Sequence, residues 1–352
     1  MTRISYENLV AFTRHALEAA GLDAFSNDAV TTGLCETSLR GVDSHGIRLL
    51  PHYVESALRG RKNPKPNMTF TSRYPAFGLL DADNAFGHAA GMKAIDHGME
   101  MAGTQGIGAV AVANSSHPGA MASFALKAAR RGFIAFAFTH ADALVLAAGG
   151  KRPLFGTNPV CMAAPRQEEE PFCLDMATSV ISWNRLKIHR DSGAPLADGI
   201  AADDNGVTTR NADEAASLMA VGSPIAAYKG YGLGAMVEIL CGVLPGMAVA
   251  RSIPAMFTTP MDEPRRLGQF YLVMQADVAD SAEGFRARLQ RMTDDVRAEP
   301  ATTPAGVMLP GDPEIREAAR RRVAGIPLDD ATVAAFRQIA ARFSIELLVE
   351  SA

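Results

Sequence analysis

Two apolar segments with a helical segment between them constrain the fold most strongly. Residues 107–112 and 133–138 are apolar runs of the kind that form buried β-strands. Residues 120–131, which lie between them, have helical character. A strand, a helix and a second strand in direct succession predict a mixed α/β centre for the chain.

Helices are expected at both ends of the chain. Apolar side chains at helical spacing begin after Ser5, and this segment ends at Gly21, a residue type that suits a helix end. The same pattern predicts helices over about 27–40, 49–58, 313–323 and 329–342. Residues 61–66 contain two prolines and are expected to form a linker.

The middle of the chain mixes short strands with helices. Apolar runs predict strands over 77–81, 160–164, 172–174 and 269–275. Helical patterns predict helices over about 90–103, 177–190, 233–244 and 282–298. Residues 191–222 are polar and rich in turn-forming types.

Composition and charge exclude several classes of protein. With 352 residues, of which 48% are hydrophobic, the chain fits a globular enzyme with a large core. Its net charge of −4 and the lack of a dense basic run argue against a nucleic-acid partner. The four cysteines are widely spaced, which predicts reduced core thiols. No apolar run reaches membrane-spanning length and no signal core is visible, so we expect a cytoplasmic protein without membrane contact.

The densest group of polar residues runs from Arg40 to Arg48. His45 stands beside the hydroxyl of Ser44, and imidazole is the side chain best matched to proton transfer near neutral pH. Arg48 follows three residues later, and arginine holds a carboxylate with two parallel donors. The stretch therefore indicates a proton donor beside a carboxylate clamp. The alternative is a polar junction in which Ser44 caps a helix and the other side chains are solvated.

Two further groups follow expected strands. His117 lies in a loop between an apolar strand and a helix, where α/β proteins gather ligand contacts, so it is a candidate for acid–base chemistry or cofactor contact. Thr157 and Asn158 stand between a glycine and a proline and could line a planar ring. The alternatives are a helix-capping histidine and an ordinary turn.

Residues 174–179 place Asp175 at a strand end and Thr178 with Ser179 near the expected start of the 177–190 helix. Free backbone N–H groups at such a start would suit a phosphate. Asp175 could orient His45, or it could be a helix cap.

The glycine-rich segment 228–234 leads into an apolar helix but does not match G-x-G-x-x-G, and no GxxxxGK[ST] occurs. A Rossmann dehydrogenase and a kinase or ATPase are therefore disfavoured, although Lys229 could meet a phosphate. The eight histidines include no HxxH or HExxH, so no metal site is expected. A serine hydrolase is disfavoured because G-x-S-x-G is absent and the adjacent side chains of Ser44 and His45 are expected to diverge.

Taken together, these motifs resemble the second type of the malate/L-lactate dehydrogenase family, which includes sulfolactate, ureidoglycolate and 2,3-diketogulonate dehydrogenases and Δ1-piperideine-2-carboxylate reductase. The resemblance covers about residues 5–342. The matching segments, in the family's order, are residues 40–46, 114–117, 149–150, 156–159, 175–179, 228–233 and 309–311.

The resemblance implies a mixed α/β (α+β), non-Rossmann NAD(P)-binding fold with a largely antiparallel central sheet. It also implies a helical domain made from both termini, here residues 1–66 plus 305–352, and a cofactor-binding and dimerisation region over residues 67–304. Members usually form homodimers. His45 would donate a proton to the substrate, with Ser44 and Asp175 as its relay, and Arg48 would hold the substrate carboxylate.

By the same resemblance, NAD(H) or NADP(H) would be the cofactor. The residues expected to contact cofactor or substrate are His117, Thr157, Asn158, Leu174, Asp175, Met176, Thr178, Ser179, Tyr228, Lys229, Gly311 and Asp312. The implied reaction is hydride transfer between the nicotinamide and a small 2-oxo or 2-hydroxy acid. A reductase of a cyclic imine carboxylate and a catalytically silent nicotinamide-binding protein are the alternatives.

The sequence departs from the family pattern around the catalytic stretch, which is itself intact. The departures include Pro118, His140, Asn184, Ala226 and Ala227. Pro118 removes both an aromatic wall and a backbone donor. These changes lead to the hypothesis that the reductase chemistry is retained on an unusual substrate.

Overall fold

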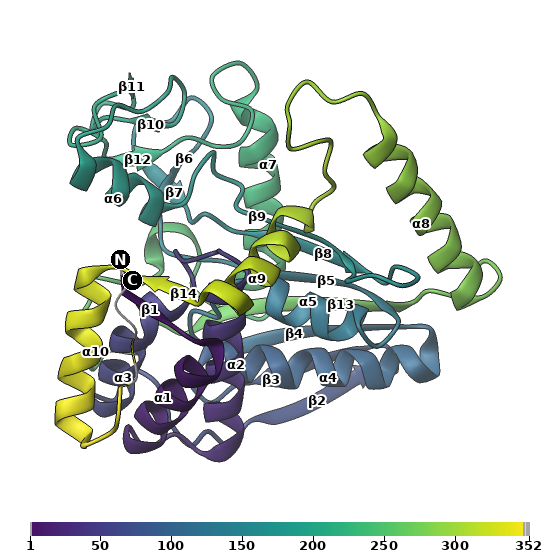
Figure 1. The fold of residues 1–352 in the computed structure, drawn as a ribbon, viewed down its shortest axis with the longest axis horizontal. Helices are drawn as coiled ribbons and strands as arrows, with labels where there is room; N and C mark the ends of the chain where they lie inside the picture. Colours follow the sequence, from purple (N-terminus) through teal and green to yellow (C-terminus); the bar gives the residue numbers. More distant parts are fainter. Residues whose placement is uncertain (1, 348, 350–352) are drawn as a thin grey trace.

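A seven-stranded sheet forms the centre of the protein, whose computed structural model describes residues 2–347 and residue 349 (Figure 1). The strand order is β2-β3-β4-β13-β5-β8-β9. The strands are β2 (Thr69–Tyr74), β3 (Phe77–Asp81), β4 (Ile107–Ser115), β5 (Phe133–Thr139), β8 (Val160–Ala164), β9 (Phe172–Met176) and β13 (Leu267–Gln275). β3 and β4 run parallel, and the other neighbouring pairs are antiparallel. The predicted mixed α/β centre is confirmed.

Helices pack on both faces of this sheet. They are α4 (Gly87–Gln105), α5 (Ala122–Ala129), α7 (Ala227–Glu238) and its π-helical continuation η2 (Ile239–Val243). Successive side chains of a strand point to opposite faces. Val110 and Val112 of β4 therefore share the main core with α4 and α5, whereas Ala109 and Ala111 share a second core with α7 and η2.

The two ends of the chain meet beside the sheet (Figure 1). β1 (Thr2–Ile4) pairs with β14 (Ile326–Leu328), and the rings of Phe12 and Phe336 pack 5.0 Å apart between α1 and α10. The helices of this part are α1 (Tyr6–Ala19), α2 (Ala24–Leu39), η1 (Ile47–Leu49), α3 (Leu50–Leu58), α9 (Asp312–Ala324) and α10 (Asp330–Phe343). One buried core continues from them into α4 and α5. The division into domains at residues 66 and 305 stays a prediction.

A smaller lobe comes from the turn-rich region. Its five-stranded sheet contains β6 (Val145–Leu146), β7 (Pro153–Phe155), β10 (Ala201–Ala202), β11 (Thr208–Thr209) and β12 (Ser217–Leu218). α6 (Trp183–Ser192) packs on it, and Leu186, Leu196 and Leu218 are buried in its own core. Strands of two or three residues carry too little periodicity to be recognised in a sequence.

Two predicted helix starts are wrong. The helix expected over 177–190 begins only at Trp183, because the N–H groups of Thr178 and Val180 bond to the carbonyls of Thr157 and Met219 instead of starting a helix. The helix expected over 233–244 begins at Ala227.

The helix predicted over 282–298 is α8 (Ala282–Ala298), and a short 3-10 turn, η3 (Ala250–Ser252), precedes β13. Within the described part of the chain, no helix combines the length and apolar character needed to cross a membrane.

Candidate active site

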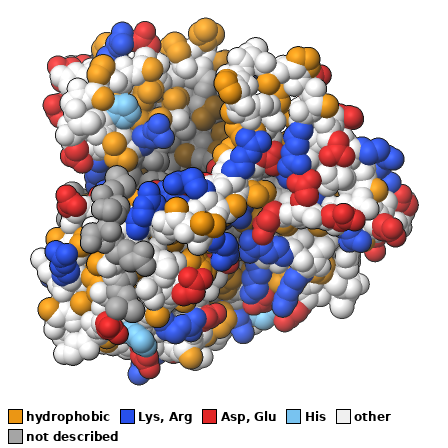
Figure 2. Space-filling view, viewed as in Figure 1, with side chains coloured by type: hydrophobic (Ala, Val, Ile, Leu, Met, Phe, Trp, Pro, Cys, Tyr) orange, Lys and Arg blue, Asp and Glu red, His pale blue; other side chains and the backbone are white. Residues whose placement is uncertain are grey.

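Three connected cavities run from α9 to the loop after β4. The outer cavity, about 430 Å³, lies between α2, α5, β9 and residues 308–314. The middle cavity, about 320 Å³, shares Val42, Ala120 and Asp175 with it. The inner cavity, about 80 Å³, shares His45 and Thr157 with the middle one. Figure 2 shows the surface hollowed between the lobe that carries α6 and the segment that leads into α9, where these linings lie.

The His45 segment is fixed from two sides. Asp43 forms a two-pronged ion pair with Arg321 of α9, with N–O distances of 2.6 and 2.8 Å. On the other side, the hydroxyl of Ser38 accepts a hydrogen bond from the N–H of Ile47 (2.8 Å), and a Cβ at Gly46 would collide with that hydroxyl. These contacts place the sequence between α2 and η1 at the cavity wall.

Ser44 and His45 meet, contrary to the expectation that their side chains diverge. Ser44 Oγ lies 2.9 Å from His45 Nδ1 because the backbone turns sharply between α2 and η1. When the hydroxyl donates to Nδ1, the proton of the neutral ring is on Nε2. Burial lowers the pKa of His45, so its ring is neutral at pH 7.

His117 faces the same inner cavity as His45, and the two rings stack with centroids 5.7 Å apart. The hydroxyl of Tyr53 lies 3.0 Å from His117 Nδ1, and the N–H of Gly119 donates to the same nitrogen at 3.3 Å. Nδ1 is therefore an acceptor, which puts the proton of the neutral ring on Nε2. Burial, and next the neighbouring ring of His45, hold the pKa of His117 well below its usual value.

Asp175 lines both the outer and the middle cavity. Its Oδ2 accepts a hydrogen bond from the N–H of Ala122 (2.8 Å), so it caps the start of α5 across space. Asp175 is an exposed residue of the cleft wall, and the loss of water around its carboxyl group raises the pKa to about 6. Its contacts with described residues include no hydrogen bond to Ser44 or His45, and the proton relay stays a prediction.

Arg48 lies at the rim, outside the linings of the three cavities. Its Nε pairs with Asp329 at 3.3 Å, and its side chain is 44% exposed. Asp329 also caps α10 by accepting from the N–H of Thr332 (2.7 Å). A role as carboxylate clamp would require the guanidinium to leave this partner, and the clamp stays a prediction.

Of the predicted pair, Thr157 lines the cavities, whereas Asn158 is buried and has a structural role. Thr157 lines the middle and inner cavities. Asn158 is fully buried, with its Oδ1 accepting from the N–H of Ala141 (3.1 Å) and its Nδ2 donating to Glu238 (2.8 Å). Asn158 therefore holds the turn behind the wall, and its predicted cofactor contact is untested.

Residues 174–179 form one wall of the cleft. Leu174 lines the outer cavity, and Met176 and Ser179 line the middle one. Thr178 lies behind this wall, where its hydroxyl donates to the carbonyl of Thr157 (3.0 Å). No helix starts at Thr178, so the reason given for phosphate binding at its N–H is wrong.

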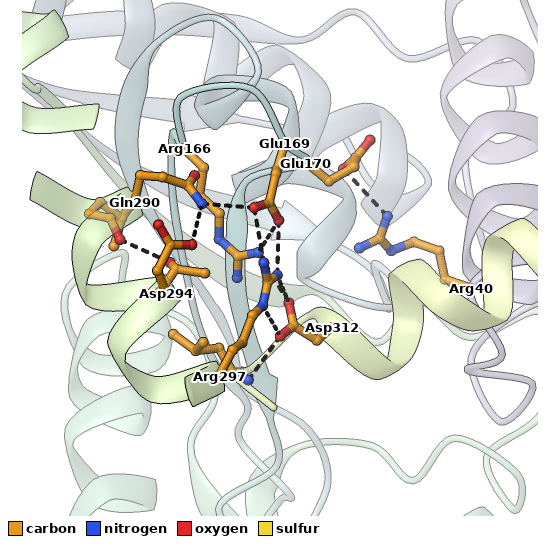
Figure 3. Close-up of polar contacts among 11 residues, drawn as sticks. Arg40, Arg166, Glu169, Glu170, Gln290, Asp294, Arg297 and Asp312 are labelled. Atoms are coloured by element: carbon orange, nitrogen blue, oxygen red, sulfur yellow. Dashed lines mark hydrogen bonds and ion pairs between the residues drawn. The ribbon is translucent and has the colours of Figure 1, made fainter. Parts of the chain in front are cut away.

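Of the last four predicted contact residues, Gly311 lines the outer cavity, with φ of 95°. Tyr228 and Lys229 are exposed in the first turn of α7 and belong to none of the three cavity linings. Asp312 is buried behind Gly311, and its carboxylate accepts from Arg166 (3.1 Å) and Arg297 (2.9 Å), as Figure 3 shows. Asp312 thus anchors the Gly311 turn, and its predicted contact with a cofactor is untested.

The sequence analysis missed several contacts around the inner cavity. Tyr53, which is fully buried and holds His117 from outside the lining, carries no local signal of that contact. Asn184 was recognised only as a departure from the family pattern; together with Trp183 it lines the cavity, and its Nδ2 donates to the carbonyl of Ser44 (2.8 Å). Asp142 lines it too and pairs with the buried Arg265. These contacts join segments far apart in sequence, so no local pattern signals them.

The family model for malate/L-lactate dehydrogenase matches residues 4–337. This chain belongs to that family. The predicted family and the prediction of a dehydrogenase or reductase are confirmed.

Members of the malate/L-lactate dehydrogenase family resemble this chain over nearly its whole length. Ureidoglycolate dehydrogenase (NAD(+)) of Escherichia coli K12 is 32% identical over 332 residues, which cover 93% of each chain. The structure of malate dehydrogenase from Pyrococcus horikoshii OT3 matches with a TM-score of 0.89 and 28% identity, covering 98% of this chain and 97% of that chain. Δ1-Piperideine-2-carboxylate reductase from Pseudomonas syringae pathovar tomato matches with a TM-score of 0.84 and 26% identity, covering 97% and 100%.

Two departures from the family pattern have structural partners. His140 Nε2 accepts from the N–H of Gly268 (2.9 Å), and its other ring nitrogen faces Glu238 at 3.8 Å. Asn184 holds the backbone of the His45 segment through the carbonyl of Ser44. These two altered residues are therefore held in place by hydrogen bonds within the fold.

Proposed function

We propose that this protein transfers a hydride between NAD(P)H and a small 2-oxo acid, or in reverse from a 2-hydroxy acid, with His45 as the proton donor. The observation that carries the proposal is the position of two histidines, His45 and His117, at the inner end of three adjoining cavities. Aliphatic side chains and a few charged ones line the outer cavity, and aliphatic side chains with several hydroxyl groups line the middle one. This order fits an adenine, then riboses and phosphates, then a reacting carbonyl.

The cleft residues would hold the dinucleotide in an extended conformation. Leu126, Leu174 and Leu309 offer apolar walls for the adenine, and Thr157 and Ser179 line the part of the cleft for the riboses and phosphates. The family's relative in Escherichia coli K12 is named as NAD(+)-dependent, which supports a nicotinamide cofactor. When bound, the nicotinamide supplies the hydride in reduction and accepts it in oxidation.

In the proposed reduction, His45 Nε2 gives its proton to the carbonyl oxygen of the substrate. The hydroxyl of Ser44, 2.9 Å from Nδ1, passes its own proton to that nitrogen at the same time, so the ring stays neutral. Asp175 replaces the proton of Ser44, and its pKa of about 6 suits this task near neutral pH. The carboxyl group of Asp175 must then come within hydrogen-bond reach of Ser44 when the cleft is filled.

His117 and Arg48 have supporting roles in this proposal. The neutral His117 presents its Nε2–H as a hydrogen-bond donor in the inner cavity, where it would orient the substrate oxygen. Arg48 would exchange Asp329 for the substrate carboxylate, an exchange of one oxyanion for another. The small volume of the inner cavity, about 80 Å³, with Trp183 and Asn184 in its wall, favours a compact substrate.

Reduction of a cyclic imine carboxylate is the second candidate. Such a substrate also presents a carboxylate beside an electrophilic carbon, so the same proton donor and clamp serve it. The fold of this chain resembles that of Δ1-piperideine-2-carboxylate reductase over 97% of its length. This resemblance is the reason for including cyclic imine carboxylates among the substrates to be tested.

The test follows reduced-nicotinamide absorbance with NADH and with NADPH against a panel of 2-oxo acids and cyclic imine carboxylates. We expect turnover on at least one panel member. On pyruvate and oxaloacetate we expect weaker turnover than a typical member of the family shows, because the pocket is altered. Cofactor binding without turnover on any member would favour a silent binding protein and contradict the proposal.

We also propose that the protein pairs with a second copy through α7 and η2. Apolar side chains at helical spacing are 38 to 61% exposed there: Leu233, Met236, Ile239, Val243 and Leu244. Sedimentation velocity should give a dimer, and Ile239→Asp with Val243→Asp should give monomers. Val323→Asp, on an apolar residue 92% exposed on α9, is the matched control. A monomeric wild-type protein at micromolar concentration would contradict this pairing.

A further inference from the structure

The outer cavity carries more acidic than basic side chains. Glu36, Asp175 and Glu314 are its acids, and Arg40 is its one cation among the described lining residues. The remaining walls are mostly aliphatic. An adenosine held there would have its ribose hydroxyls within a field set by these four groups.

The positive charge of Arg40 is compensated by an ion pair. Its Nη1 lies 3.6 Å from Glu170, the contact that Figure 3 draws on the right, and its side chain is 11% exposed. Behind it, Arg130 pairs with both Glu170 (3.2 Å) and Glu36 (3.4 Å). Arg40, Arg130, Glu36 and Glu170 thus form a chain of alternating charge with no net charge. This chain offers no free guanidinium to a phosphate.

Asp175 and Glu314 are the two lining carboxylates that form no ion pair among the described residues. Glu314 lies in the first turn of α9, and none of the hydrogen bonds among described residues involves its side chain. Its negative charge reaches Asp175 across the cavity, where it helps raise the pKa of that carboxyl group. Glu314 therefore faces the cavity without a compensating charge.

The position of Glu314 is fixed by the turn before it. Asp312, the first residue of α9, is held by Arg297 (2.9 Å) and Arg166 (3.1 Å) and accepts from the N–H of Leu309 (3.0 Å). Pro313 follows within the first turn and fixes its own φ. The restrained turn fixes the backbone from which the Glu314 side chain extends, so its carboxylate stays within reach of the cavity.

We propose that the outer cavity selects an adenosine with a free 2′-hydroxyl, and hence NAD(H) over NADP(H), with Glu314 as the specificity-determining residue. The inference rests on the proposed function, which assigns the adenosine to this cavity. A carboxylate accepts a hydrogen bond from a ribose hydroxyl, whereas a 2′-phosphate would bring two negative charges beside an uncompensated third.

Binding of NADH and NADPH to the purified protein without substrate tests the proposal, measured by nicotinamide fluorescence and by calorimetry. NADH should bind at least about tenfold more tightly, a ratio that corresponds to about 1.4 kcal/mol. Added salt should narrow the gap because it screens the repulsion. The fragments 5′-AMP and 2′,5′-ADP should show the same preference at the adenosine end alone.

Glu314→Gln keeps the size of the side chain and removes its charge. The variant should bind NADH more weakly and NADPH more tightly, so that the two dissociation constants differ by no more than about threefold. Glu283→Gln is the matched control, because Glu283 occupies the first turn of α8 outside the cavity. Thermal unfolding of both variants shows whether the fold is kept. If Glu314→Gln unfolds, Glu314→Asp, which keeps the charge, should retain the preference for NADH.

Equal or tighter binding of NADPH by the wild-type protein would overturn the selectivity while leaving the proposed function intact. An unchanged preference in a folded Glu314→Gln variant would overturn the assignment to Glu314. Binding of neither dinucleotide would overturn the proposed function, and the selectivity with it.

Discussion

The hydroxyl of Tyr53 and Nδ1 of His117 lie 3.0 Å apart, although 64 positions separate them in the sequence. This contact joins α3 of the helical part to the loop after β4 of the central sheet. It fixes the ring of His117 so that Nε2 faces the inner cavity, where His45 also lies. The orientation of the second histidine therefore depends on the helical part of the chain.

Tyr53→Phe should lower kcat about 10- to 100-fold and cost about 1–2 kcal/mol of stability, because the buried ring and carbonyl of His117 lose the hydroxyl that bonds to them. Steady-state kinetics and urea unfolding measure both. Tyr271→Phe is the control, since its buried hydroxyl donates to Gln269 (2.6 Å) away from the cavities. Equal effects of both variants on kcat would show that the Tyr53 contact has only a structural role.

Arg48→Lys should raise KM for the carboxylate substrate and leave kcat nearly unchanged, since an ammonium group cannot reproduce the two parallel donors. Arg14→Lys is a suitable control, because Arg14 forms another exposed ion pair with a carboxylate, Asp28 (2.8 Å). An unchanged KM in Arg48→Lys would leave Arg48 as the partner of Asp329 alone.

Stability should fall as the pH falls below about 6.5. Burial lowers the pKa of His52 and His88 from 6.5 to about 3, so between these values the unfolded chain binds protons on them that the folded chain does not. Each such histidine contributes about 1.4 kcal/mol per pH unit across this window. Urea unfolding from pH 7.5 to 4.5 measures the slope.

His88→Met should reduce this slope, whereas His15→Met, at an exposed position of α1, should not. Comparing slopes removes any change in packing that affects all pH values alike. A His88→Met slope equal to the wild-type slope would show that His88 is protonated in the folded protein.

Lys62→Met should stabilise the protein by about 1–2 kcal/mol. Lys62 Nζ is buried 3.6 Å from the ring centre of Tyr53 and has no hydrogen-bond partner among described residues. Burial holds its pKa well below the usual value, and a thioether keeps the contact with the ring without an unsatisfied amine. Lys65→Met, at an exposed position of the same segment, is the control. Destabilisation specific to Lys62→Met in urea unfolding would contradict this account.

Local patterns predicted most of the longer helices and strands and proposed residues for the site. The cap at Ser5, the glycine end at Gly21 and the bounds of α8 all follow from helical spacing and capping chemistry. Ser44 and His45 were found because polar residues are adjacent in sequence. The family resemblance then brought in distant segments, several of which line the same cleft.

Features that depend on distant partners were not predictable. The start of α6 at Trp183 is set by Thr157 and Met219, which take the N–H groups of the preceding residues. Lys62 stands in a segment that reads as a solvated linker, yet it is buried against Tyr53. Sequence spacing carries no information on such contacts, because they depend on how the helical part closes on the sheet.

The most direct test of the account is the turnover of His45→Ala, measured by reduced-nicotinamide absorbance on whichever substrate the wild-type protein accepts. Turnover should fall roughly 10²- to 10⁴-fold, as expected when a general acid is removed. Cofactor affinity should stay within about threefold, and His15→Ala should match the wild type. Turnover of His45→Ala close to that of the wild-type protein would contradict the assignment of His45 as the proton donor.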